Sequence, residues 1–275
     1  MIGSFGQLVQ YAAHKNANES SASRLPNGYY ETAGNTTTGS KYIDTGLKSN
    51  VNDEYIITCA RANDTDNLPV LGDGASKTDS NIALWINPKT NLVEFTYGNG
   101  GSNDYKVLTS SYNVQVFHTY RMEVSTGKAW LDDDYIGQSK SHSNVTNSKK
   151  LVFLGSWRGS TANGYYKGTV SEFIIIRNGE TIRHFVPAIR KSDSACGYYD
   201  LCESASPKTG TPFYLPNTGT LTAYEVFMEN PDENSEIQFD VNIESAGGSF
   251  AFDGVFKVAS MLSIGWGDGT QDQYA

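Results

Sequence analysis

The chain has 275 residues and a formal net charge of −9, with 21 Lys and Arg against 30 Asp and Glu. This acidic balance argues against a nucleic-acid binder, because phosphate contacts need a surplus of Lys and Arg on some face. Charged residues make up only 19% and aromatic residues 12%, which is typical of an all-β protein and not of a disordered chain. No apolar run approaches the ~18 residues that a membrane-spanning helix requires.

Residues 1–24 are expected to form a short N-terminal arm that docks on a partner. Only residues 7–20 show helical spacing, with Leu8, Tyr11 and Ala12 on one face, and this run is short for a stable isolated helix. The first residues also lack the basic and apolar regions of a secretory signal.

From residue 25 onward the hydrophobic period changes to two, which indicates β-strands. Phe117–Ser125 and Leu92–Tyr97 alternate as half-buried strands do. Four more runs are expected to be strands buried on both faces: Tyr55–Ala60, Ile82–Ile86, Leu151–Leu154 and Val170–Ile176. Short Asp-Gly and Asn-Gly pairs predict turns at Asp73-Gly74, Asn99-Gly100, Asn163-Gly164 and Asn178-Gly179. Frequent strands with no long helix between them predict an antiparallel sandwich.

The charge of the chain is concentrated at its C-terminal end. Residues 223–275 contain one basic residue, Lys257, and ten acidic ones, so that 1 − 10 = −9 equals the net charge of the whole chain. Such a sharp change in composition predicts a domain boundary near Thr222.

Three ordered motifs carry a resemblance to a known family. They are YIDTG (42–46), KG-x-V-x-E-F (167–173) and FVPAIRKSD…GYYDL (185–201). With them, residues 25–222 resemble the laminin-G-like (concanavalin A-like) jelly-roll modules of surface proteins and virion fibre proteins associated with gut bacteria. The resemblance implies an all-β, concanavalin A-like antiparallel jelly-roll sandwich over this range. It implies little about function, because this fold carries lectins, hydrolases, adhesins and spacers.

The C-terminal segment resembles the start of a second module. GWGDGT (265–270) is similar to the W-G-D-G-T signature of PKD-like bacterial surface β-sandwiches, and strands are expected at Glu236–Ile243 and Phe250–Val258. Residues 223–275 are therefore expected to begin an incomplete PKD-like β module, a partial second β-sandwich. Because half a sandwich exposes apolar strand edges, we expect either that the polypeptide continues or that a neighbouring subunit supplies the missing strands.

Catalytic chemistry is not expected. Glycoside hydrolases of this class need two carboxylates about 5–5.5 Å apart on one face of a cleft, and no strand carries that pattern. Asp132, Asp133 and Asp134 are consecutive and are interpreted as a polar hairpin turn. No catalytic residue is predicted, and a glycoside hydrolase is the weakest of the functions considered.

The histidines and cysteines are interpreted as structural. His118 and His184 lie at apolar-face positions of strands, where a hydrogen-bonded core histidine is favoured over a metal ligand. The three cysteines Cys59, Cys196 and Cys202 are an odd number and cannot form a closed disulfide framework, so they are interpreted as buried or idle thiols.

Two binding sites are considered. The resemblance implies a rim calcium ion, for which Asp73 in LGDGAS and Asp79 or Asn81 would supply oxygens. The alternative is an Asp-Gly turn without an ion. A sugar site needs an exposed aromatic ring with polar groups beside it, and Trp157, Arg158 and Tyr165 offer these types. The alternative is that Trp157 plugs the end of the sandwich.

Two classes of function remain. In the first, the chain is a virion protein of a tailed phage, a head or tail fibre that is a homotrimer, docks on capsid or tail proteins through its arm and attaches to cell-surface glycans. In the second, it is a bacterial cell-surface adhesin or carbohydrate-binding module. The absence of a signal-like start, together with thiols that tolerate a reducing compartment, favours the virion.

Overall fold

A computed structural model describes residues 24–73, 82–98, 103–109, 112–139, 149–158, 161–163, 165–202, 212–226, 262–265 and 271–274. The chain divides into two compact units, Met1–Glu233 and Asn234–Ala275. The described residues are strands, turns and irregular segments, and none of them belongs to a helix that could cross a membrane. The predicted N-terminal arm, apart from Arg24, lies outside these residues.

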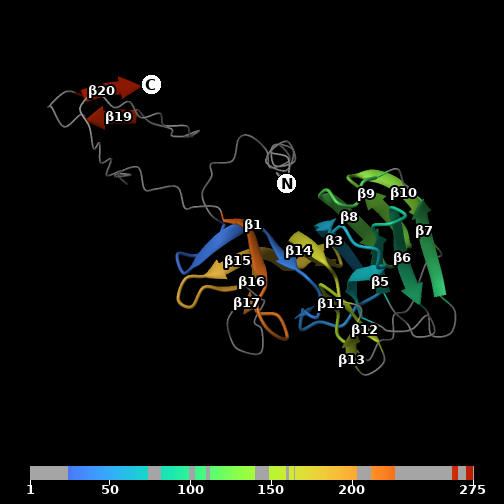
Figure 1. Cartoon of the computed structure of the whole chain (residues 1–275). Helices are drawn as coiled ribbons and strands as arrows, with labels where there is room; N and C mark the ends of the chain where they lie inside the picture. Colours follow the sequence, from blue (N-terminus) through green and yellow to red (C-terminus); the bar gives the residue numbers. More distant parts are fainter. Residues whose placement is uncertain are drawn as a thin grey trace. The chain divides into compact units, whose positions relative to one another are not determined.

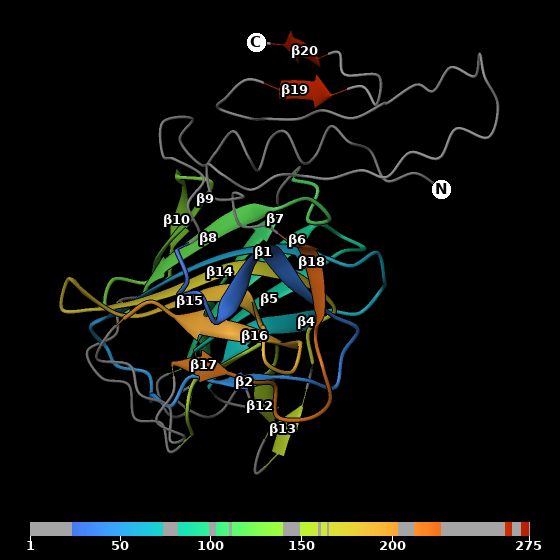
Figure 2. The same ribbon diagram turned by 90° about the vertical axis from the view of Figure 1, so that its left-hand side faces the viewer.

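The larger sheet of the first unit has ten strands in the order β10-β9-β8-β3-β14-β1-β15-β16-β17, with β18 paired to β1 (Figure 2). Every pairing within it is antiparallel. In chain order its strands are β1 (Tyr29–Thr37), β3 (Asp53–Arg61), β8 (His118–Glu123), β9 (Lys128–Leu131), β10 (Asp134–Gln138), β14 (Gly168–Arg177), β15 (Glu180–Arg190), β16 (Ala195–Asp200), β17 (Phe213–Tyr214) and β18 (Thr222–Val226).

The smaller sheet has six strands in the order β2-β11-β4-β5-β6-β7, all antiparallel. Its strands β5, β6, β7 and β11 are labelled in Figure 1. A separate hairpin, β12 (Ser156–Arg158) with β13 (Thr161–Asn163), follows β11. The strands of the smaller sheet are β2 (Ile43–Asp44), β4 (Leu68–Gly72), β5 (Ile82–Asn87), β6 (Leu92–Gly98), β7 (Asn103–Thr109) and β11 (Val152–Phe153).

The two sheets pack face to face over one hydrophobic core. Phe153 of the smaller sheet shows this directly, because its ring centroid lies 5.2 Å from those of Phe173 and Phe185 and 4.8 Å from that of Tyr198, all in the larger sheet. Such aromatic contacts between facing layers are the core of a β-sandwich. The predicted all-β antiparallel sandwich is confirmed.

Two strands predicted to be buried on both faces are buried on one. In β3 the buried residues alternate with half-buried ones such as Ile56, and β14 likewise leaves Ile174 and Ile176 half-buried. The physical reason is that only one face of the larger sheet packs on the smaller one, so the other face is covered by neighbouring side chains alone. In contrast, β8 alternates as predicted, with His118, Tyr120 and Met122 buried.

Two hairpins have the turns that their sequences predict. Asn178 and Gly179 adopt φ values of 54° and 81° between Arg177 and Glu180, which pair across the hairpin. Asp132 and Asp133, with φ values of 49° and 70°, join β9 to β10 in the same way and confirm the polar hairpin. Two central residues with positive φ are the mark of a type I′ turn. The other predicted turns lie wholly or partly outside the described residues.

The C-terminal part of the chain contributes to both units. β18 pairs with β1 in the larger sheet, so the predicted boundary near Thr222 falls at the first residue of this strand. In the second unit, β19 (Leu262–Gly265) and β20 (Gln271–Tyr274) form an antiparallel hairpin on either side of residues 266–270. Most of the GWGDGT motif and the two strands expected before it lie outside the described residues, so the PKD-like module stays a prediction.

Candidate functional site

Asp73, a predicted calcium ligand, lies at the end of β4 with no solvent exposure. Its Oδ1 accepts a hydrogen bond of 2.7 Å from the backbone N–H of Ile82, and its own N–H donates to the carbonyl of Ile82 at 3.1 Å. The carboxylate also lies near Tyr55, whose pKa is raised by burial and by the charges of Asp53 and Asp73. Asp73 is thus oriented into the protein interior.

Asp79 and Asn81 are the residues predicted to bind the calcium ion together with Asp73, and both lie outside the described residues. Among the residues that the structure describes, no group of three or more His, Cys, Asp or Glu side chains could hold a metal ion. The calcium site therefore stays a prediction.

Trp157 and Tyr165, predicted to bind sugar, come together with a third aromatic residue, Tyr42. The ring centroids of Trp157 and Tyr42 are 5.7 Å apart. A Cβ atom built on Gly155 would lie 3.6 Å from Tyr165 and 3.7 Å from Tyr42, so both tyrosines pack against this glycine. All three aromatic residues are half-buried. The backbone of Arg158 pairs with Thr161 in the β12–β13 hairpin, and its side chain lies outside the described atoms.

Lysines stand beside these rings. The Lys149 ammonium lies 5.3 Å from the centroid of the Trp157 ring, and Lys150 forms an ion pair of 3.3 Å with Asp44. The indole Nε1 of Trp157 donates to the carbonyl of Lys150 at 2.9 Å, which fixes the ring. We call Tyr42, Trp157, Tyr165, Lys149 and Lys150 the rim cluster.

The backbone that carries the rim cluster is held by long-range hydrogen bonds. The N–H of Tyr42 donates to Oδ1 of Asn217 at 2.8 Å, and the N–H of Asn217 donates to the carbonyl of Tyr42 at 3.0 Å. The N–H of Leu151, next to Lys150, donates to the carbonyl of Leu47 at 2.7 Å. In Figure 2, β2 and the β12–β13 hairpin lie at the same end of the sandwich. The cluster is therefore assembled from segments far apart in the sequence.

Tyr42 also has a perturbed hydroxyl. Burial, then the charge of Asp44 and the neighbouring Tyr165, raise its pKa above 10.0, so the phenol is protonated at neutral pH. Sequence reasoning missed this residue as a site residue. The available signal was its position as the first residue of the YIDTG motif, which was used only for the fold.

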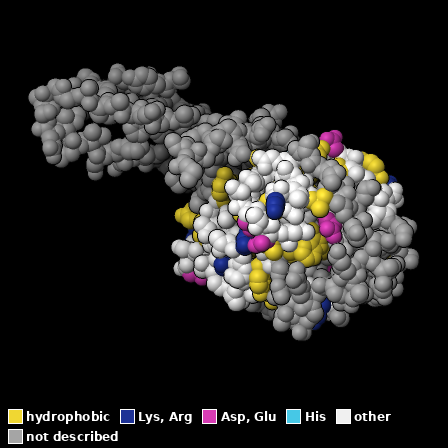
Figure 3. Space-filling model, turned by 45° about the vertical axis from the view of Figure 1, so that its right-hand side comes forward, with side chains coloured by type: hydrophobic (Ala, Val, Ile, Leu, Met, Phe, Trp, Pro, Cys, Tyr) yellow, Lys and Arg dark blue, Asp and Glu magenta, His cyan; other side chains and the backbone are white. Residues whose placement is uncertain are grey.

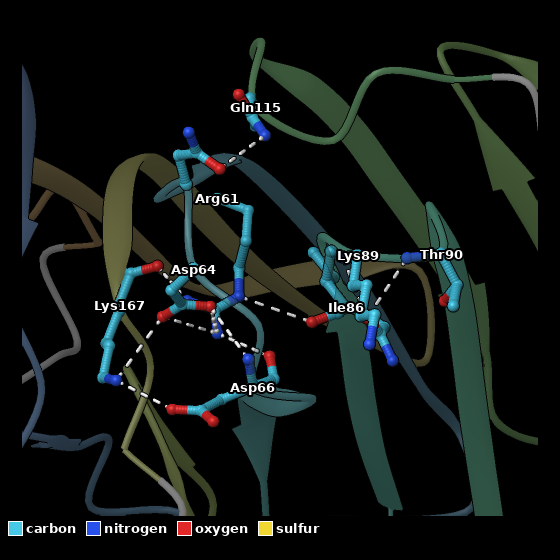
Figure 4. Close-up of polar contacts among 10 residues, drawn as sticks. Arg61, Asp64, Asp66, Ile86, Lys89, Thr90, Gln115 and Lys167 are labelled. Atoms are coloured by element: carbon cyan, nitrogen blue, oxygen red, sulfur yellow. Dashed lines mark hydrogen bonds and ion pairs between the residues drawn. The ribbon is translucent and has the colours of Figure 1, made fainter.

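A second polar cluster, shown in Figure 4, is occupied by its own charges. The fully buried guanidinium of Arg61 donates to Asp64 at 3.1 Å and to the carbonyl of Asp66 at 2.9 Å, and it also reaches the carbonyls of Ile86 and Lys167. The ammonium of Lys167 lies 2.8 Å from Asp66 and 3.5 Å from Asp64. We call this group the Arg61 clamp and interpret it as structural, because its carboxylates already hold two cations.

Two histidines lie within the described residues, His118 and His184, and both have hydrogen-bond partners. His118 is buried, with Nδ1 at 2.5 Å from Asp132 and Nε2 at 3.2 Å from the carbonyl of Asn113, as expected of a core histidine. The interpretation of His184 as a core residue is wrong, because its half-buried side chain lies on the outer face and contacts Glu172 at 2.8 Å. The three cysteines are free, and only Cys59 is fully buried.

The surface shown in Figure 3 carries acidic and basic side chains scattered among uncharged ones. The described side chains on this face form no extended basic or acidic patch, so electrostatic attraction among them does not mark a binding site.

The sequence matches no protein-family model and no curated protein. Similar solved structures include the CBM40 of the Ruminococcus gnavus IT-sialidase bound to α2,3 sialyllactose, with 13% identity, a TM-score of 0.44 and coverage of 56% of this chain and 92% of that one. A putative carbohydrate-binding protein from Bacteroides ovatus shows 15% identity and a TM-score of 0.46, over 73% of this chain and 62% of that one.

Domains LG4-5 of the mouse laminin α1 chain show 12% identity and a TM-score of 0.43, over 60% of this chain and 47% of that one. These domains are laminin G domains, the class of module that motifs such as YIDTG resemble. All three TM-scores are below 0.5. The sandwich architecture therefore rests on the strand order and register of this chain and not on these similarities.

Proposed function

We propose that the first unit is a lectin-like module that binds glycans, and that the rim cluster is its binding site. The observation that carries the proposal is the meeting of Tyr42, Trp157 and Tyr165 beside two lysines. Sugar binding combines an aromatic ring, against which the C–H face of a pyranose packs, with polar groups that bond its hydroxyls. These side-chain types are gathered here on a backbone that is held in place.

The lysines indicate which sugar fits. The Lys149 ammonium lies over one side of the Trp157 ring and the Lys150 ammonium lies beside Asp44, so positive charge adjoins the aromatic surface. A sugar carboxylate placed there would form a charge-assisted hydrogen bond, which is stronger than a neutral one. The ligand class that we propose is therefore an acidic sugar at the end of a glycan.

We further propose that the chain is a virion fibre of a tailed phage, homotrimeric and attached through its N-terminal arm to capsid or tail proteins. The sequence motifs support this setting. A bacterial cell-surface adhesin or carbohydrate-binding module is the alternative, and it would use the same glycan site.

We also propose that the module is not an enzyme. Glu54 and Glu123 face each other on adjacent strands, but both contact the guanidinium of Arg121, at 2.5 and 3.4 Å. Both carboxylates are thus already paired with a cation inside the protein, an arrangement that supports a structural role for the pair. Release of reducing sugar from any polysaccharide that the chain binds would contradict this proposal.

A glycan array with the full chain tests the binding function. We expect binding to glycans that end in an acidic sugar, and a loss of at least about tenfold in affinity for Trp157→Ala and Lys149→Ala. Tyr30→Ala is the matched control, because Tyr30 is 38% exposed and carries its own lysine, Lys191, at 4.4 Å from its ring. Lys149→Ala keeps the aromatic packing, so its loss of binding is not a loss of folding.

Failure of the unmodified chain to bind any acidic glycan, or full binding by both variants, would contradict the rim site. The virion setting has separate tests. Light scattering should give a mass three times 30.0 kDa, and the gene should lie beside capsid or tail genes. A monomer, or a neighbourhood of surface-export genes, would favour the adhesin.

A further inference from the structure

A row of side chains crosses the outer face of the larger sheet. Its members are paired across consecutive strands β10, β9, β8, β3, β14 and β15, and are, in that order, Tyr135, Trp130, Arg121, Ile56, Ile174 and His184. Their neighbours along each strand, such as Tyr55, Met122 and Phe173, belong to the core, so the row points away from it. With strands ~4.8 Å apart, the row is about 24 Å long. We call it the outer row.

The aromatic end of the outer row is exposed. Tyr135 is 55% exposed, the most exposed of the large hydrophobic side chains in the described part of the chain. Its ring centroid lies 5.9 Å from that of Trp130, in an edge-to-face arrangement. Neither ring belongs to the hydrophobic core. Two adjacent rings at the edge of a sheet contribute apolar surface that folding alone does not bury.

The charged part of the outer row is held in one geometry. The Arg121 guanidinium carbon lies 4.4 Å from the centroid of the Trp130 ring, a cation–π contact. Its Nε lies 2.5 Å from Glu54 and its Nη2 3.4 Å from Glu123. Thr126 donates to the other oxygen of Glu123 at 2.7 Å. Donors and acceptors are thus fixed beside the rings, in a network of one guanidinium and two carboxylates whose formal charge is negative.

These features together match one kind of ligand. The exposed ring of Tyr135 can pack against the C–H face of a pyranose, and fixed carboxylate and guanidinium groups can bond its hydroxyls. Two carboxylates against one guanidinium leave a negative charge that repels an anionic sugar, which favours a neutral sugar over the acidic one proposed for the rim cluster. A row of paired residues that crosses six strands fits an extended chain and not a branched or helical one.

We propose that the outer row is a second carbohydrate-binding surface, which binds a neutral, extended, linear polysaccharide across the strands of the larger sheet. The ligand lies with sugar rings on Tyr135 and Trp130 and continues over Ile56 and Ile174. This surface uses none of the residues of the rim cluster, and the two sites bind independently.

Affinity electrophoresis of the full chain tests the proposal, with soluble hydroxyethyl cellulose and glucomannan as extended neutral chains. Soluble starch, a glucose polymer of coiled shape, is the control ligand. We expect retardation by the extended chains and not by starch. Tyr135→Ala should weaken the affinity about tenfold and Tyr135→Phe should retain it, because packing against the ring is the main interaction. Arg121→Ala should weaken it further.

Tyr30→Ala is the control variant and should bind as the unmodified chain does. Tyr135 is exposed, so its replacement leaves the core intact, and circular dichroism melts verify this. The proposal is overturned if neither extended polysaccharide retards the chain, or if Tyr135→Ala and Arg121→Ala bind normally. It is also overturned if Tyr135→Ala instead lowers the mass measured by light scattering, because the row is then an interface between copies.

Discussion

The main chain of Ile82 forms two hydrogen bonds with Asp73, one from its N–H to the carboxylate Oδ1 at 2.7 Å and one from its carbonyl to the Asp73 N–H at 3.1 Å. This reciprocal pair joins the end of β4 to the start of β5. The carboxylate is buried, so it replaces water as the partner of an N–H that would otherwise be unsatisfied.

Replacing Asp73 should therefore destabilise the fold. We expect Asp73→Ala to lower the free energy of unfolding by about 2 kcal/mol, the cost of a buried donor without its acceptor, and Asp73→Asn to cost less because an acceptor oxygen remains. Urea unfolding measures both. A chelator that lowers the melting temperature of the unmodified chain but not of Asp73→Asn would show instead that Asp73 binds calcium.

The Arg61 clamp gives a larger effect. Arg61→Ala should lower the free energy of unfolding by about 3–5 kcal/mol, because Asp64 and several carbonyls lose a buried cation together. Arg61→Lys should retain only part of this stability, since an ammonium group cannot form the several hydrogen bonds of the planar guanidinium. Lys167→Ala, at the exposed side of the same cluster, is the control and should have little effect. Equal losses in Arg61→Ala and Lys167→Ala would contradict this account.

The backbone at Gly168 accounts for the glycine in the KG-x-V-x-E-F motif. Its φ is +149°, and a Cβ atom there would clash with the carbonyl oxygen of Ala60 in the neighbouring strand. We expect Gly168→Ala to lower the free energy of unfolding by about 2–3 kcal/mol. Gly28→Ala, where nothing lies within 4 Å of the added atom, should be nearly neutral. Thermal melts compare the two, and similar midpoints would contradict the steric argument.

Glu172 makes the stability of the folded chain depend on pH in the acidic range. Burial by itself raises its pKa, but hydrogen bonds from His184 and Arg24 outweigh this and lower the pKa below 4.5. A carboxyl whose pKa is depressed by folding stabilises the native state above its unfolded pKa, and this contribution is lost as the pH falls through the folded pKa. Glu172→Gln should therefore be less stable at neutral pH and show a flatter decline below pH 4.5 in urea unfolding.

Glu180→Gln, at the exposed first residue of β15, is the control substitution. It should leave the stability at neutral pH unchanged. An unaltered decline in Glu172→Gln would mean that other carboxyls govern acid unfolding.

The thiols should be poorly reactive in the native protein. Burial raises the pKa of Cys59 to about 12, and burial with the charge of Asp200 raises that of Cys202 to about 11. Because the thiolate is the reactive form, we expect an aromatic disulfide reagent at neutral pH to leave Cys59 unmodified until the chain is unfolded. Absorbance counts the thiols before and after adding guanidinium chloride. Rapid modification of all three in the native protein would contradict the burial of Cys59.

Much of the strand pattern could be predicted from the sequence, because the alternation of side chains along a strand is a local property of the backbone. His118, Tyr120 and Met122 alternate as their spacing predicts, and Asn178 and Gly179 form the turn that their φ preferences favour. The hairpin at Asp132 and Asp133 is local in the same sense. The resemblance to a sandwich module follows from such local motifs in their order.

The sites depend on tertiary structure. Tyr42 meets Trp157, and Ile56 meets Arg121, only because strand order and register bring together residues far apart in the chain. Likewise, the half-buried faces of β3 and β14 depend on which side of the larger sheet the smaller one covers. Local sequence determines where strands and turns form. Which side chains become neighbours is decided by the simultaneous packing of both sheets, because each register must satisfy the shared core at once.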